Sequence, residues 1–424
     1  MASDGMCSNK GKIALVLAGG GITGAVYEIG ALRAIDDLLV DRTVNDLDIY
    51  VGTSAGALVA AALANGLSPA AMLETFDGSD AERHALKRGH IFRSNRREFL
   101  RRTLDLPRVL AGAWSHYFRH LDDMTVVDML WSLFEALPSG MYDMLALEQY
   151  VRGMLSGSDL CNRFEELTRN LYIIATDLDT GERVVFGDGE HRDVPISLAI
   201  AASSALPLLY KPVRVGDKDC VDGGLRGNAS LDLAIEQGAT LVICINPLVP
   251  YDNRDRDSIP FLGPDGGYLS EKGAQSIASQ TLRILTHSSL HYHVKQLRRQ
   301  HPEVDIILIE PRPSDHQMFF YNIMRYSARL TVARHGFESV TLDLAEDYPH
   351  YKEILARHGV PLSRRLVISE LADIKESGYD PEVISQVLEA RSGACNREGR
   401  GTPVGQLTRA LAELELVLNT TAEC

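Results

Sequence analysis

One stretch decides the expected fold of this chain: Ile49-Tyr50-Val51-Gly52-Thr53-Ser54-Ala55-Gly56. It joins a short apolar run to a Gly-x-Ser-x-Gly pentapeptide, and the Ala- and Leu-rich residues 57–64 follow directly. Strand, glycine-flanked serine and helix, in that order, are typical of a nucleophile elbow, because small glycines on both sides of the serine let the backbone turn sharply. With Gly52 and Gly56 in these places, the pattern predicts that the Ser54 hydroxyl is exposed where a strand ends and a helix begins.

Apolar runs and helical repeats alternate along much of the rest of the chain. The apolar runs predict strands over residues 12–17, 48–51, 171–176, 183–186, 213–215, 241–246 and 305–309. Periodic apolar positions predict helices over residues 25–39, 194–203, 230–237, 274–299 and 321–344. This alternation is typical of an α/β fold around a mostly parallel, buried sheet.

The composition narrows the classes of function. The chain has 424 residues, of which 45% are hydrophobic and 24% charged, an ordinary globular composition with enough material for a large core. Its formal net charge of -14 argues against nucleic-acid binding, because affinity for a polyanion comes largely from basic side chains that neutralise phosphates. We therefore expect no nucleic-acid partner.

The cysteines and the amino-terminal residues bear on location. The six cysteines are scattered without a CxxC pair, which is more typical of a reduced cytoplasmic protein than of a disulfide framework or a zinc site. Residues 1–9 contain no apolar segment of the kind found in signal peptides. We expect a cytoplasmic protein able to associate with the surface of a membrane, with signal-independent secretion as an open alternative.

Two segments stand apart from the predicted α/β domain of residues 10–360. The first is a helical insertion over residues 74–140, in which residues 83–119 hold ten basic side chains against two acidic ones. An apolar stretch, residues 124–137, follows it. One interpretation is a basic amphipathic surface that contacts anionic lipid. The other is a solvated helical face whose arginines pair with the acidic core.

The second segment is a helical carboxyl-terminal extension over residues 361–424. It includes a Gly-rich linker at residues 392–405 and a final amphipathic helix at residues 406–418. An appendage or an oligomerisation helix would both fit this pattern, so an oligomer is possible.

A glycine-rich stretch, Ala18-Gly19-Gly20-Gly21-Ile22-Thr23-Gly24, follows the first predicted strand and satisfies Gly-x-Gly-x-x-Gly. Such a stretch could bind the pyrophosphate of a dinucleotide, or its backbone amides could form an oxyanion hole. The dinucleotide interpretation lacks its ribose ligand, because the nearest acidic candidate, Asp48, comes before the second strand rather than at its end. We favour the oxyanion hole, with amide donors from Gly19, Gly20, Gly21 and Ile22.

A serine nucleophile needs a base, and none of the thirteen histidines lies in a recognisable motif. His287 and His291 have the i, i+4 spacing of metal ligands on a predicted helix that also carries His293. No acidic partner is spaced to complete such a site, so we expect these histidines on an exposed helix face.

The better candidate base is Asp222, which begins Asp222-Gly223-Gly224 at the end of a predicted hairpin over residues 211–221. Contact with Ser54 in a partly dehydrated pocket would raise its pKa and make it a competent base. The two glycines would let the backbone pass close to the elbow. A second Asp-Gly-Gly begins at Asp265, but it lies in an expected exposed loop and follows no strand.

Five motifs, in this order along residues 12–247, resemble those of the patatin-like phospholipase family. They are the glycine-rich loop at residues 17–24, the elbow at 52–56, Ala-Thr-Asp-Leu-Asp-Thr-Gly at 175–181, Ala-Ser-Ser-Ala-Leu-Pro at 202–207 and Asp-Gly-Gly at 222–224. The resemblance implies a three-layer α/β/α fold, a modification of the α/β-hydrolase fold. It also implies a Ser-Asp dyad that needs neither histidine, metal nor cofactor.

In that family the nucleophile would be Ser54, the base Asp222, and the oxyanion donors the backbone of the loop at Gly19–Gly21. The implied activity is cleavage of fatty acyl esters of glycerolipids through an acyl-serine intermediate, with acyl transfer as an alternative. A nucleotide-binding protein and a catalytically dead lipid-binding protein are further alternatives. One departure is Thr23, where the family often has Arg or Lys, which puts the substrate preference in question. Asp177 is expected to brace a turn.

Overall fold

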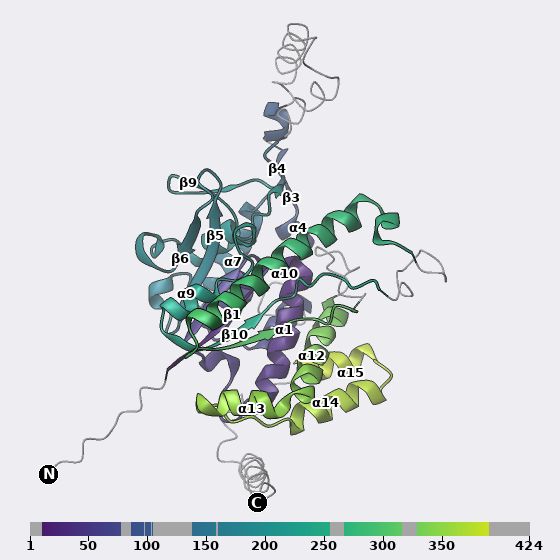
Figure 1. Ribbon diagram of the computed structural model, residues 1–424. Coiled ribbons are helices and arrows are strands. Elements are labelled where there is room, and N and C mark those ends of the chain that lie inside the picture. The colour runs from purple at the N-terminus through teal and green to yellow at the C-terminus, as the bar shows by residue number, and fades with distance from the viewer. Residues whose placement is uncertain are drawn as a thin grey trace, which may run out of the picture.

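A central sheet with helices on both faces forms the body of the protein (Figure 1). The computed structural model describes residues 11–77, 86–96, 98–102, 104, 138–157, 160–254, 267–315 and 329–389. The sheet has eight strands in the order β11-β10-β1-β2-β5-β9-β8, with β6 paired to β5. The strands from β11 to β5 are mutually parallel, while β6, β8 and β9 run antiparallel to their neighbours. The chain therefore has the mixed, mostly parallel α/β architecture that the sequence predicts.

The sheet strands lie at or close to their predicted positions. They are β1 (Lys12–Leu17), β2 (Ile49–Thr53), β5 (Asn170–Asp177), β6 (Arg183–Phe186), β8 (Val213–Val215), β9 (Lys218–Asp222), β10 (Ala239–Ile245) and β11 (Asp305–Ile309). The central strands are buried on both faces, which explains their continuous apolar runs.

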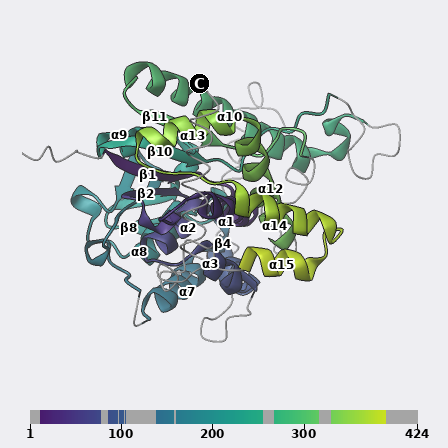
Figure 2. The same ribbon diagram turned by 90° about the horizontal axis from the view of Figure 1, so that it is seen from below.

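Two hydrophobic cores lie on opposite faces of the sheet, because successive side chains of a strand point to opposite sides. On one face α1 (Gly21–Leu38), α2 (Ala55–Ala64), α8 (Ile196–Ser203) and α12 (Arg329–Glu346) cover the sheet. On the other face lie α9 (Leu231–Glu236) and α10 (Ala274–Gln300). Figure 2 shows the strands β1 and β2 between these two layers.

The remaining described helices surround these layers. They are α3 (Pro69–Asp77), α4 (Arg88–Ile91), α7 (Leu145–Leu155), α13 (Tyr348–Arg357), α14 (Arg365–Glu376) and α15 (Pro381–Glu389). Within the described residues, no helix is at once long enough and apolar enough to cross a bilayer.

A second, small sheet was not predicted from the sequence. It joins β3 (Arg93–Ser94), β4 (Gly140–Asp143) and β7 (Leu208–Tyr210) in the order β3-β4-β7. Each pairing involves only two residues of each strand, so these strands leave no apolar periodicity to detect. The sheet connects β3, which lies inside the predicted insertion, and β4, which lies at its end, to the segment that follows α8.

The two segments expected to stand apart are only partly described. In the insertion, residues 105–137 lie outside the described residues, so its contact with an anionic membrane stays a prediction. In the extension, the Gly-rich linker and the helix at residues 406–418 lie outside them too. Residues 365–389 form α14 and α15, which pack beside α12 and add Val367, Leu371 and Ile384 to the core around α1 (Figures 1 and 2).

Candidate active site

Ser54 lies between the end of β2 and the start of α2, with φ 55° and ψ −122°. A non-glycine residue in this region costs about 1–3 kcal/mol, so the surrounding structure must hold it there. The flanking glycines permit the turn. A Cβ at Gly52 would lie 2.5 Å from the Cα of Ala57, and one at Gly56 would lie 2.5 Å from the carbonyl oxygen of Leu17. The strand–turn–helix geometry that the pattern predicts around Ser54 is therefore present in this structure.

Two serines from the end of α8 hold the elbow in place. The Ser54 amide donates to Oγ of Ser203 at 2.8 Å, and the Ser203 hydroxyl donates to the carbonyl of Ile174 at 2.5 Å. The Ser204 hydroxyl donates to the Ser54 carbonyl at 3.2 Å. The sequence singled out residues 202–207 as a motif without a role, and the structure shows that its two serines fix the backbone of Ser54.

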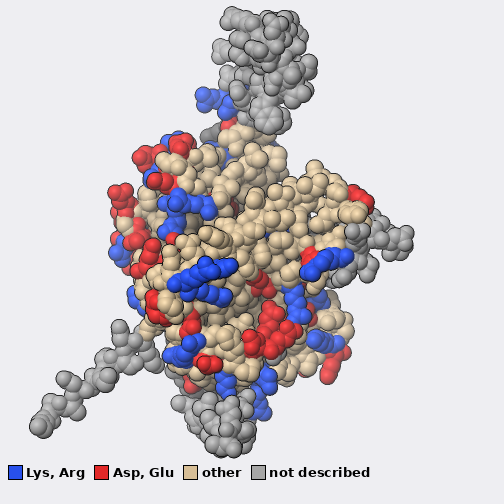
Figure 3. Space-filling view, in the orientation of Figure 1, with Lys and Arg blue, Asp and Glu red and all other residues tan. Residues whose placement is uncertain are grey.

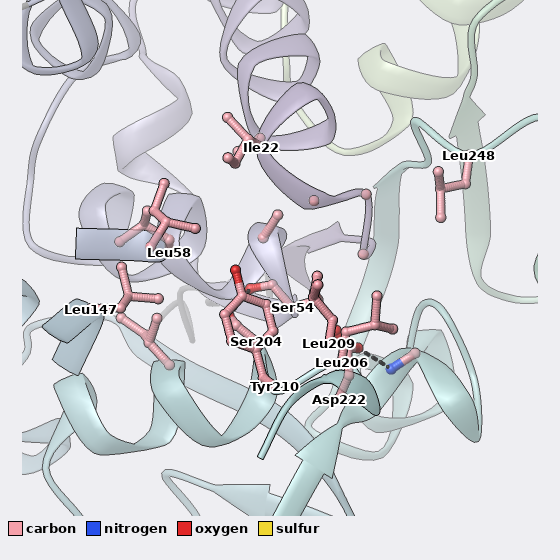
Figure 4. Close-up of a pocket in the computed structure, with 18 of the residues that line it drawn as sticks. Ile22, Ser54, Leu58, Leu147, Ser204, Leu206, Leu209, Tyr210, Asp222 and Leu248 are labelled. Carbon is pink, nitrogen blue, oxygen red and sulfur yellow. Dashed lines mark hydrogen bonds between the residues drawn. The ribbon is translucent and has the colours of Figure 1, made fainter. Parts of the chain in front are cut away.

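The Ser54 hydroxyl donates to Oδ2 of Asp222 at 2.5 Å. Asp222 is the last residue of β9, and its other carboxylate oxygen accepts the Gly224 amide at 2.8 Å, which is drawn as a dashed line in Figure 4. Gly223 lies between them, packed against the backbone of Ile174 on β5. The structure thus brings together the two side chains that the sequence selected as nucleophile and base.

Burial sets the acid–base character of this pair. The exposed fractions are 8% for Ser54 and 6% for Asp222. Burial raises the pKa of Asp222 to about 6, although the hydrogen bonds from Ser54 and Gly224 act to lower it. A carboxylate with that pKa is still mostly ionised at neutral pH and is a stronger base than an exposed aspartate.

The glycine-rich loop lies directly against the elbow. A Cβ at Gly19 would be 3.2 Å from the Cβ of Ser54 and 2.8 Å from Oδ1 of Asn228. The Gly19 amide donates to both the side chain and the backbone carbonyl of Asn228, at 3.1 and 3.3 Å. The prediction that Gly19 supplies a free amide donor is therefore not met, because Asn228 takes up that amide. Sequence reasoning missed Asn228, which lies 209 positions away.

The other predicted donors lie at the amino-terminal end of α1. Gly20 is its N-cap, and α1 starts at Gly21, four residues before the predicted start. The first amides of a helix have no partner inside the helix, and the helix dipole favours negative charge there. Gly20, Gly21 and Ile22 thus remain the candidate donors for an oxyanion. Gly24 and the buried Thr23 lie in the first turn of α1.

A pocket of about 130 Å³ opens beside Ser54 and Asp222 (Figure 4). It is lined mainly by apolar side chains from α1, α2, α7 and α8, from the residues of β7 and from α10. The figure labels Ile22, Leu58, Leu147, Leu206, Leu209 and Leu248 among them. An apolar cavity next to a buried Ser-Asp pair suits an acyl chain attached to a reactive carbonyl.

Three further predictions concern residues outside the pocket. Asp177 accepts hydrogen bonds from the Asp179 amide and the Thr180 hydroxyl, which confirms that it braces a turn. Asp48 accepts the Ile13 amide at 2.9 Å, at the opposite end of β1 from the glycine-rich loop. Asp48 is thus far from the position that a ribose ligand requires. The second Asp-Gly-Gly begins outside the described residues.

The prediction that no acidic partner completes the histidine pair on α10 is wrong. Glu310, the residue after β11, lies next to His287 and His291. Within the part of the chain that the structure describes, these three form one group whose ligand atoms lie within 4.8 Å of one another. The i, i+4 spacing of the histidines was visible in the sequence, but the neighbouring strand that supplies the carboxylate was not.

Comparison with known proteins identifies the family to which this chain is similar. The model of the family described as Patatin-like phospholipase matches residues 15–235, slightly more than half of the chain. The matched region contains the glycine-rich loop, the elbow and Asp222.

Curated relatives match about half of the chain. Two uncharacterized NTE family proteins, from strains of Mycobacterium tuberculosis and Mycobacterium bovis, are each 27% identical over 237 residues, which is 55% of this chain. The match spans only 30% of the length of each relative.

Solved structures with detectable likeness include VipD from Legionella pneumophila, at 15% identity and a TM-score of 0.33 over 97% of this chain and 88% of that one. Another is the ExoU-SpcU complex of the type III secretion system of Pseudomonas aeruginosa, at 18% identity and a TM-score of 0.23 over 96% and 69% of the two chains. Likeness at these TM-scores adds nothing to the assignment of the site.

Proposed function

We propose, since this chain belongs to the patatin-like phospholipase family, that it is a serine hydrolase of fatty acyl esters of glycerolipids, of the phospholipase A or lysophospholipase type. One observation carries the proposal: the hydroxyl of Ser54 donates to Asp222 at 2.5 Å at the wall of an apolar pocket. The pair supplies a nucleophile and its base, and the pocket supplies a place for the acyl chain.

In the acylation step, Oγ of Ser54 attacks the ester carbonyl while Asp222 accepts the hydroxyl proton. The negative oxygen of the tetrahedral intermediate faces the amides of Gly20–Ile22 at the start of α1, where helix dipole and free N–H groups favour negative charge. The bond between the carbonyl carbon and the alcohol oxygen then breaks. The departing alcohol takes the proton from Asp222, and an acyl-Ser54 ester remains.

Deacylation repeats the proton transfers with water as the nucleophile. Asp222 accepts a proton from the water molecule as its oxygen bonds to the acyl carbon. The bond from that carbon to Oγ breaks, Asp222 returns the proton to Ser54, and the fatty acid leaves. An alcohol acceptor in place of water would give acyl transfer by the same steps, so the two reactions differ only in the acceptor.

Apolar side chains that are exposed near the pocket support a lipid as the substrate. Leu225 lines the pocket and is half exposed, and Leu208, which precedes the lining residue Leu209, is 87% exposed. On α10, Ile284 and Leu285 are exposed close to Leu282, which lines the pocket. In Figure 3 the surface over the first half of this helix is broad and has few charged side chains. Such a surface is suited to contact with an aggregated lipid.

Labelling with a fluorophosphonate, followed by lipid analysis, tests the proposal. The wild-type protein and Ser156→Ala, which changes an exposed serine at the end of α7, are expected to be labelled. Ser54→Ala is expected to lose the label. Mass spectrometry of phospholipids incubated with each protein should then show free fatty acid for the two labelled proteins. Adding an alcohol acceptor separates hydrolysis from acyl transfer. Labelling that persists in Ser54→Ala would exclude Ser54 as the nucleophile.

A further inference from the structure

A cluster of two histidines and a glutamate lies beside the active-site pocket and has no part in the proposed reaction. His287 and His291 occupy adjacent turns on one face of α10, and Glu310 follows the last residue of β11. The Nε2 atom of His291 lies 2.8 Å from one oxygen of Glu310, and that of His287 lies 3.6 Å from the other. Two different segments of the chain, the helix α10 and the residue after β11, thus direct three ligand atoms toward one another.

The arrangement of these atoms suits a small metal ion. The two imidazole rings have centroids 4.0 Å apart, and all three ligand atoms lie within 4.8 Å of one another. Ligands bound at about 2.0–2.2 Å to a tetrahedral ion are separated from each other by roughly 3.5 Å. Small rotations of side chains would therefore bring the three atoms into a coordination shell.

Neighbouring groups orient the glutamate as a ligand. Its Oε1 atom accepts a hydrogen bond of 2.7 Å from Nδ2 of Asn246, a fully buried residue that follows β10. One oxygen of the carboxylate is thus held by Asn246 in the way that outer groups orient the ligands of metal sites.

The cluster is also accessible from solvent. The side chain of His291 is 47% exposed and that of His287 is 25% exposed, whereas Glu310 beneath them is 17% exposed. An ion can therefore reach the imidazoles from solvent.

We propose that His287, His291 and Glu310 bind one divalent first-row transition-metal ion, with Zn²⁺ as the best match. Two imidazole nitrogens and one carboxylate oxygen suit zinc, with water as the fourth ligand. Ca²⁺ and Mg²⁺ prefer shells made of oxygen, so this donor set selects against them. The site is separate from the Ser54-Asp222 pair and supplies no group to it.

The position of the site assigns it a structural role in the pocket wall. Leu282 and Thr286 of α10 line the pocket, and Thr286 immediately precedes His287. Most of the buried residues of α10 lie further along, at Leu290, Val294 and Leu297. A metal ion would tie the middle of α10 to the end of β11, next to the part of the helix that forms the wall. The bound ion would thus stabilise the pocket without taking part in the reaction.

Zinc titration of the 424-residue chain by isothermal calorimetry tests the proposal, with the Ser54→Ala protein as a background that separates binding from hydrolysis. We expect one saturable site, and an affinity at least tenfold lower in His291→Ala and in Glu310→Gln. His293→Ala is the matched control, because His293 lies on the same helix outside the cluster. It should bind zinc like the parent protein. Equal affinity in His291→Ala and Glu310→Gln, or no saturable binding, would overturn the site.

Cobalt substitution identifies the ligands independently, because the chain contains six cysteines that can also bind zinc. A Co²⁺ complex with two imidazoles and a carboxylate lacks the near-ultraviolet charge-transfer band of a thiolate ligand. The expected spectrum has visible d–d bands without that band, and they disappear in His287→Ala. A thiolate band at one equivalent of Co²⁺ would contradict the proposed ligands. Zinc should also raise the apparent Tm of the parent and of His293→Ala, and leave that of His291→Ala unchanged.

Discussion

The Ser54-Asp222 pair and the His287-His291-Glu310 cluster lie at the same edge of the sheet but differ in their access to water. The pair is more than nine-tenths buried, and each carboxylate oxygen of Asp222 accepts a hydrogen bond. The cluster has one histidine that is almost half exposed. Burial of the pair raises the basicity of Asp222, which proton transfer requires. Exposure of the cluster leaves its nitrogens accessible to an ion. One edge of the sheet thus carries two polar sites whose surroundings suit different chemistry.

A chain of hydrogen bonds runs from one site to the other. The Gly19 amide, next to Ser54, donates to Asn228, whose Nδ2 donates to Oδ1 of Asn246 at 2.9 Å. Asn246 in turn donates to Glu310 at 2.7 Å. The two sites therefore differ in exposure but are linked through Asn228 and Asn246. Variants can separate what each site needs from what these two asparagines provide.

The largest effect is expected from removing either member of the pair. Ser54→Ala and Asp222→Asn should each lower kcat for ester hydrolysis by roughly 10⁴-fold or more, because nucleophile and base act as a unit. For the same reason the double variant should be hardly worse than either single one. Fatty acid release from a phospholipid measures all three proteins. His291→Ala is the control from the other site and should keep its activity. Nearly full activity in Asp222→Asn would mean that another group is the base.

The close contact between Gly19 and Ser54 predicts the next largest effect. In Gly19→Ala the new Cβ would lie 2.8 Å from Oδ1 of Asn228 and 3.2 Å from the Cβ of Ser54, so the loop or the elbow must move. A displacement of about 1 Å in an active site costs on the order of a hundredfold in rate. Gly153→Ala on α7 is the matched control, because a Cβ there meets nothing within 4 Å. If kcat/KM of Gly19→Ala equals that of Gly153→Ala, the loop does not position the nucleophile.

These two sites also differ in how far the sequence could predict them. The elbow and Asp222 were predictable because each depends on a few neighbouring residues at the end of a strand. The link through Asn228 and Asn246 was not, since these residues lie in no motif and their partners are set by tertiary pairing. Glu310 belongs to the same class: only the parallel pairing of β10 with β11 brings it beside α10. The conformation of a turn depends on neighbouring residues in the sequence. The side chains that hydrogen-bond to it come from distant segments, which only the fold brings together.

The pH dependence of hydrolysis tests the effect of burial on Asp222. Because burial raises the pKa of Asp222 to about 6, kcat/KM should rise with pH through about 6 and level off above neutral pH, as the carboxylate must be ionised to accept a proton. At one pH unit below the midpoint, activity should be about tenfold below the plateau. A midpoint near 4 would show that the carboxyl is solvated.

A histidine would titrate in the same range, so temperature is the control. A carboxyl group ionises with almost no enthalpy change, and its midpoint should hardly move between a cool and a warm assay, whereas that of an imidazole would fall on warming. The described residues that line the pocket include no histidine. A midpoint that shifts strongly with temperature would therefore assign the titration to a group outside the pair.

The smallest effect on activity is expected at Asn246, the residue that connects the two sites. It is fully buried, and Asn246→Ala leaves Nδ2 of Asn228 and Oε1 of Glu310 without this partner. Unpaired buried polar atoms cost about 1–3 kcal/mol, so the free energy of unfolding from urea titration should fall by about 2 kcal/mol. Loss of support for Asn228 should lower kcat/KM only a few-fold, because Ser54 and Asp222 keep their own contacts. Asn170→Ala, at an exposed asparagine, should change neither quantity. If Asn246→Ala destabilises the protein but leaves kcat/KM unchanged, the hydrogen-bond chain supports the fold alone and the two sites work independently.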